Sequence, residues 1–123
     1  MDTVAVVFAT NMPKDVMVFQ KACGQLEIPE NEAPLYWDLI KEEFHELNNA
    51  ACRIDELDAC LDLIWVILGY CHSKGYKVEE AWSKIVRSNM DKVDPETGKV
   101  RRRADGKIMK PDNWVGPDLT DCI

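Results

Sequence analysis

The chain has 123 residues, of which 46% are hydrophobic and 30% are charged, and its net charge is -7. This length and composition predict one globular domain over residues 1–123 with a buried core. The negative charge argues against binding to DNA or RNA, which needs a basic surface. The apolar run at 63–68 is too short to cross a membrane, so we expect no membrane partner either.

Five cysteines are present, an odd number, and no two have the Cys-x-x-Cys spacing. This usage favours free thiols in a reducing, cytoplasmic setting and argues against a zinc site. Residues 1–12 are expected to form an N-terminal arm. The apolar stretch at 4–8 has no basic segment before it, so it does not resemble a signal peptide.

Four helices are predicted in chain order. The first begins near Pro13, with Asn11 as a candidate cap, and stops at Gly24. A proline-punctuated loop at 27–34 separates it from helices expected at about 35–49, 53–74 and 78–92. The third helix is apolar on all sides over 63–68, so we expect it to be central and buried. The fold class is therefore an all-α bundle of four to five helices.

The tail, residues 93–123, differs in character. Turn signals at 94–98 and 104–106 flank two basic segments, 99–103 and 107–110. Together they predict a small β-hairpin followed by a C-terminal arm. Trp114 is expected to anchor this arm to the body of the protein or to a neighbouring subunit.

Two acidic clusters lie on successive predicted helices, Glu42, Glu43 and Glu46 on one and Asp55, Asp58 and Asp62 on the next. Carboxylates three or four residues apart share one face of a helix. Two such faces, brought together, would surround a hard cation such as Mg²⁺ or Mn²⁺ with oxygen ligands. The alternative reading is a merely solvated acidic face.

The ordered motifs resemble the all-α nucleoside triphosphate pyrophosphohydrolases, the group of MazG, phosphoribosyl-ATP pyrophosphohydrolase and dimeric dUTPase. The resemblance covers about residues 13–120 and rests on E-E-x-x-E at 42–46, DACLDLIWVILG at 58–69, RSNMDK at 87–92 and the basic tail, which is similar to that of short phage and bacterial members. One position departs from the pattern. Where the second motif, E-x-x-D, would have its glutamate, this chain has Ala59, so either Asp58 or Asp55 would be the fourth ligand.

The resemblance implies a metal-dependent hydrolase that cleaves a nucleoside triphosphate to the monophosphate and pyrophosphate. Glu43, Glu46, Asp58 and Asp62 would bind Mg²⁺ or Mn²⁺, and Glu43 or Glu46 would also orient the attacking water. The expected substrate-binding residues are Trp37, Arg87, Asn89 and Lys92. Further candidates with weaker grounds are Glu42, Asp55 and Arg102.

The resemblance of the tail to that of phage-type members implies a deoxynucleoside triphosphate such as dGTP as the substrate, with a role in control of the nucleotide pool in a bacterial cell or a phage-infected host. The alternatives are phosphoribosyl-ATP as the substrate, or a helical module that binds metal or nucleotide without turnover. The resemblance also implies a homodimer or homotetramer.

Overall fold

The computed structural model of the protein describes residues 11–123. The chain divides into two compact units, one ending at Val78 and one spanning Glu79–Ile123. Most of the predicted arm at 1–12 lies outside the described residues. The prediction of one domain over residues 1–123 stays a prediction.

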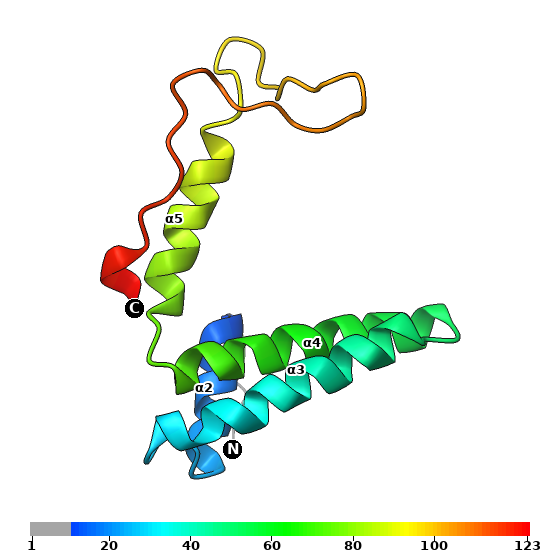
Figure 1. Ribbon diagram of the computed structural model, residues 1–123, viewed down its shortest axis with the longest axis vertical. Helices are drawn as coiled ribbons and strands as arrows, with labels where there is room; N and C mark the ends of the chain where they lie inside the picture. Colours follow the sequence, from blue (N-terminus) through cyan, green and yellow to red (C-terminus); the bar gives the residue numbers. More distant parts are fainter. Residues whose placement is uncertain (1–10) are drawn as a thin grey trace, which may run out of the picture. The chain divides into compact units, whose positions relative to one another are not determined.

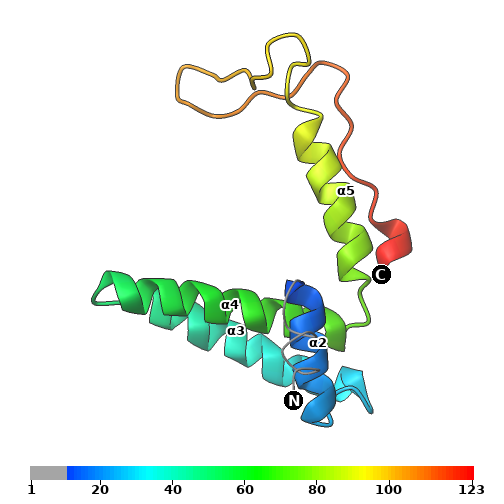
Figure 2. The same ribbon diagram turned by 180° about the vertical axis from the view of Figure 1, so that it is seen from behind.

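The first unit contains α2 (Met12–Ala22), the short 3₁₀ helix η1 (Pro29–Glu32), α3 (Ala33–Asn48) and α4 (Arg53–Ser73). Helices α3 and α4 run side by side in opposite directions, and α2 packs against α4 near the end where α3 begins (Figures 1 and 2). The second unit holds α5 (Val78–Met90), apart from its first residue, and the 3₁₀ helix η2 (Thr120–Cys122). The all-α prediction is confirmed, although the loop expected at 27–34 contains a 3₁₀ turn.

The local signals that predicted helix ends have the expected geometry. Asn11 Oδ1 accepts a hydrogen bond from Lys14 N at 3.0 Å, and Pro13 lies in the first turn of α2. Gly24 and Gly75, just beyond α2 and α4, have φ values of 73° and 76°. Glycine is favoured there because it has no Cβ to clash in this left-handed conformation.

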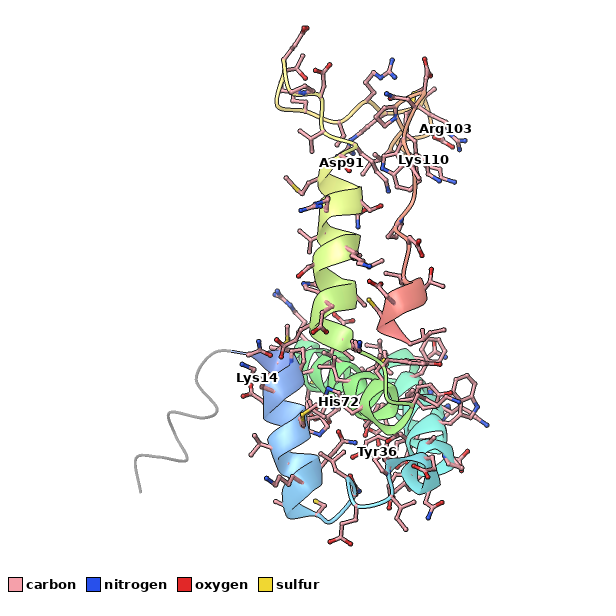
Figure 3. All side chains as sticks on the ribbon, turned by 90° about the vertical axis from the view of Figure 1, so that its left-hand side faces the viewer. Lys14, Tyr36, His72, Asp91, Arg103 and Lys110 are labelled. Carbon is pink, nitrogen blue, oxygen red and sulfur yellow. The ribbon has the colours of Figure 1, made fainter. Side chains whose placement is uncertain are left out.

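A buried polar contact joins α2 to α4. The Gln20 side chain is fully buried, and its Nε2 donates to Gly69 O at 3.1 Å. Its Oε1 lies 2.9 Å from His72 Nδ1, so that ring nitrogen must carry the proton. Figure 3 shows His72 in the interior of this unit. Because buried polar groups are costly when unpaired, these bonds set the position of α2 along α4.

Helix α4 is less enclosed than the sequence predicts. Val66 and Gly69 are buried, but Ile64 and Ile67 remain 40% and 42% exposed. Helices α2 and α3 cover only part of the α4 surface, because a helix packs against a neighbour through one stripe of side chains.

The predicted β-hairpin is wrong for the described residues, which contain no β-strand. Two isolated antiparallel bridges form instead, between Val93 and Val100 and between Arg102 and Ile108. The side chains at 101–110 are all exposed, so there is no buried apolar face that would stabilise longer strand pairing. The predicted anchoring role of Trp114 is confirmed, since its Nε1 donates to Ser88 O of α5 at 2.8 Å.

In the part of the chain that the structure describes, no helix combines the length and the apolar character that a membrane crossing requires.

Candidate metal centre

The connection between α3 and α4 positions the acidic residues. It comprises residues 49–52 only, so the second half of α3 lies beside the first half of α4, at the end of the helix pair away from α2 (Figures 1 and 2). The predicted ligands are Glu43 and Glu46 on α3 and Asp58 and Asp62 on α4. These four residues are called the carboxylate cluster below.

Glu43 is the most perturbed member of the carboxylate cluster. Its pKa is raised from 4.5 to about 7, mainly by burial and then by its hydrogen bond to Glu46 and by the charges of Glu46, Asp62 and Glu42. Its Oε2 is shielded from solvent and has no hydrogen-bond partner. A proton or a cation at this site would relieve both the repulsion and the unpaired oxygen.

Asp62 connects the two helices electrostatically. Its pKa is raised by burial first, then by the charge of Asp58 on its own helix and of Glu46 on α3. Each member of the carboxylate cluster therefore interacts with at least one other, and Asp62 interacts with all three. Asp55 has no part in these shifts.

A cavity of about 410 Å³ adjoins the carboxylate cluster at the connection between α3 and α4. Glu46, Asp55 and Asp58 line it, together with Ala59. Ala59 is 4% exposed, so the position at which the motif departs from its usual glutamate lies in the packed surface of α4. Asp58, one residue earlier, is exposed.

The donor atoms of the carboxylate cluster are of the kind that binds a hard divalent cation. Carboxylate oxygens are the ligands that Mg²⁺ and Mn²⁺ prefer, and Glu43 Oε2 is an oxygen without a partner. As the side chains stand, no three His, Cys, Asp or Glu residues among 11–123 converge closely enough to hold a metal ion. Ligation would therefore require side chains of the carboxylate cluster to turn toward the ion.

The predicted phosphate ligands lie in the second unit. Lys92 Nζ donates to Asn89 Oδ1 at 3.0 Å, and Asn89 Nδ2 donates to Ile85 O at 3.2 Å, so Asn89 links the lysine to the last turns of α5. Arg87 is exposed and lines a cavity of about 500 Å³ with Ser88 and Asp118.

The other predicted residues have more peripheral surroundings. Trp37, near the start of α3, is 52% exposed and packs against Tyr70 of α4, with the ring centroids 5.5 Å apart. Glu42 and Arg102 are exposed, and Arg102 forms one of the isolated bridges. Among these three, only Glu42 acts on the carboxylate cluster, through its charge on Glu43.

A comparison with protein families finds a match to the chain. The pattern described as phosphoribosyl-ATP pyrophosphohydrolase matches residues 25–89, which is more than half of the chain. The chain belongs to this family. The family is part of the all-α nucleoside triphosphate pyrophosphohydrolase superfamily, as the sequence motifs predict. The matched range includes the whole carboxylate cluster and Asn89 but ends before Lys92 and the basic tail. No curated protein gives a significant match to the chain.

Proposed function

We propose that the protein is a divalent-metal-dependent pyrophosphohydrolase that cleaves the bond between the α- and β-phosphates of a nucleotide. Water adds to the α-phosphorus, the bond to the bridging oxygen breaks, and the products are a nucleoside monophosphate and pyrophosphate. The observation that carries this proposal is the carboxylate cluster, with its buried unpaired oxygen, on the two helices that the family match covers.

The carboxylate cluster would hold Mg²⁺ or Mn²⁺, which when bound neutralises phosphate oxygens and favours attack on phosphorus. Glu43 would accept a proton from the attacking water. Glu46 would orient that water or Glu43 through its hydrogen bond. Lys92 and Asn89 would bind the phosphate chain, with Arg87 as a further cation.

Phosphoribosyl-ATP is the substrate that the family match supports best. A deoxynucleoside triphosphate such as dGTP, which the tail favours, is the second candidate. Both substrates release pyrophosphate in the same reaction, so one assay compares them.

The test measures pyrophosphate release from phosphoribosyl-ATP and from a panel of ribo- and deoxynucleoside triphosphates, with Mg²⁺ and with Mn²⁺. Glu46→Gln should abolish turnover without changing the fold. Glu56→Gln is a matched control, because Glu56 is an exposed α4 glutamate that contributes to neither Glu43 nor Asp62. Metal-independent release, or full activity in Glu46→Gln, would contradict the proposal. Binding of nucleotide without turnover would favour the non-catalytic alternative.

The same proposal includes a homodimer. Four apolar side chains of α4 follow helical spacing and are exposed: Ile54, Leu57, Leu61 and Ile64, at 81%, 61%, 54% and 40%. A continuous apolar stripe of this kind is costly in water. A second copy of the chain can cover it by placing the same stripe against it about a two-fold axis. Asp58 lies four residues after Ile54 and three before Leu61, so this stripe borders the carboxylate cluster and a partner chain would lie beside the metal centre.

A further inference from the structure

Trp114 is held firmly against α5 in the second unit. Its indole Nε1 donates to Ser88 O at 2.8 Å, and Ser88 is buried. The ring therefore has a defined orientation at the point where the basic arm, defined here as residues 99–110, returns to the helix.

Two lysines contact this one ring from different parts of the chain. Lys92 Nζ lies 5.1 Å from the ring centroid and Lys110 Nζ lies 4.7 Å from it. Figure 3 shows Lys110 on the arm, with Asp91 at the end of α5. A tryptophan face attracts an ammonium group by only about 0.5–1 kcal/mol at an exposed site, which does not neutralise its charge.

These cations lack a carboxylate partner. Among residues 11–123 the ion pairs are Lys41 with Asp38, Lys84 with Asp121 and Arg103 with Asp105. Neither lysine at Trp114 takes part, and neither does Arg101 of the arm. Positive charge is thus concentrated at one place, which would attract an anion.

A cavity of about 350 Å³ lies beside the two lysines. Lys92 and Arg101 line it, and so do Met109 and Pro111 on either side of Lys110. A backbone hydrogen bond from Met109 N to Arg101 O, 2.7 Å long, ties the two sides of the arm together at this wall.

Two carboxylates also line the cavity, and they limit what it can bind. Asp94 Oδ1 accepts from Glu96 N at 2.9 Å, so it is engaged in a turn. Asp91 is exposed and would repel an anion. The lining holds two cations, Lys92 and Arg101, against these two acids, of which one is already hydrogen-bonded, and Lys110 beside the cavity adds a third cation.

We propose that this cavity is a phosphate-binding site in which Lys92, Lys110 and Arg101 are the donors. A phosphate group accepts several charged hydrogen bonds at once, from the guanidinium in pairs and from ammonium groups singly. The proposal deepens the proposed function and rests on it in so far as the phosphate belongs to the nucleotide or to released pyrophosphate. Arg101 is among the arginines at 101–103 that the sequence suggests as phosphate ligands, and Lys110 is an addition to them.

The test titrates inorganic pyrophosphate into the full chain in metal-free buffer by calorimetry. Lys110→Gln and Arg101→Gln should each weaken binding by about tenfold, the loss typical of one charged hydrogen bond. Lys107→Gln is the matched control, since it removes one positive charge from the same exposed arm but neither lines the cavity nor contacts Trp114. It should change the affinity by no more than about twofold, because an exposed charge at a distance is screened. Asp91→Asn should tighten binding.

Titrations with inorganic phosphate and with a non-hydrolysable nucleoside triphosphate distinguish the source of the phosphate. Tighter binding of the nucleotide, weakened in Lys110→Gln, would assign the cavity to the substrate. Tighter binding of pyrophosphate would assign it to the product.

No pyrophosphate binding by the wild-type chain, or equal losses in Lys107→Gln and Lys110→Gln, would overturn the proposal. The proposed function fails separately. Hydrolysis by Lys110→Gln with an unchanged KM would contradict the phosphate site but not the proposed function. Pyrophosphate binding without turnover of any nucleotide would contradict the proposed function but not the phosphate site.

Discussion

The ring of Tyr36 fills the space that a side chain at position 69 would need. A Cβ built on Gly69 would lie 2.2 Å from Tyr36 Cε1 and 2.6 Å from Cδ1. Both residues are buried, and Tyr36 OH donates to Gln25 Oε1 at 2.5 Å, so the ring is not free to move away. This close approach determines how near α3 and α4 can come at one end of the first unit.

Gly69→Ala should therefore destabilise the protein by about 1–3 kcal/mol, the usual cost of overpacking a core. The direction of the change in stability is informative, because replacing glycine by alanine inside a helix otherwise stabilises a protein by roughly 0.5–1 kcal/mol. Urea unfolding measures the change. In a Tyr36→Leu background the substitution should cost less, because the smaller side chain leaves room for the added methyl. Equal costs in the two backgrounds would contradict the steric explanation.

Gln20→Met should cost about 2 kcal/mol, because it removes a buried donor to Gly69 O and a buried acceptor for His72 Nδ1 while keeping similar volume. Lys21→Met, at an exposed neighbouring position of α2, should be almost neutral. Thermal unfolding followed by circular dichroism compares the two variants. A neutral Gln20→Met would mean that the polar contact between α2 and α4 is dispensable.

The metal-free protein should lose stability as pH rises from about 4.5 through about 7. In this window the folded chain keeps a proton on Glu43, whose pKa is raised from 4.5 to about 7, while the unfolded chain has released it. The folded state binds more protons there, so the free energy of unfolding falls with increasing pH. Melting temperatures in EDTA buffers should show this slope for the wild type and a smaller one for Glu43→Gln. Parallel slopes in both proteins would assign the pH dependence to other groups.

Asp58 and Asp55 can be separated by their effect on metal affinity. Asp58→Asn should weaken Mn²⁺ binding by at least about 10- to 100-fold. Substitution of a residue that only supports a metal ligand already causes a loss of this size. Asp55→Asn should have a much smaller effect, because Asp58 acts on Asp62 and Asp55 does not. Calorimetric titration of Mn²⁺ into both variants gives the comparison, and the reverse order would make Asp55 the fourth ligand.

Leu57→Glu should convert the proposed dimer to a monomer, because it places a charge in the apolar stripe of α4, where Leu57 is 61% exposed in the single chain. Asn31→Glu adds the same charge at an exposed position in η1 and should leave the dimer intact. Light scattering at micromolar concentration measures the mass. A monomeric wild-type chain would refute the dimer itself.

The helices and the acidic motifs follow from the sequence by itself because their signals are local. Asn11 and Pro13 begin α2, Gly24 and Gly75 lie beyond helix ends, and the spacing of Glu43 and Glu46 puts both on one helix face. Such signals act over one or two helical turns, so they can be recognised in the sequence without knowledge of the tertiary packing. The same holds for the family, whose pattern lies in α3, α4 and most of α5.

Only the tertiary structure decided which of these residues meet. The raised pKa of Glu43 depends first on its burial and in part on the charge of Asp62 on another helix, and the contacts of Trp114 with Lys92 and Lys110 depend on how the basic arm returns to α5. The predicted hairpin failed for the same reason. Its turn residues are local signals, but strand pairing needs an apolar surface to pack against, and the exposed side chains at 101–110 have none.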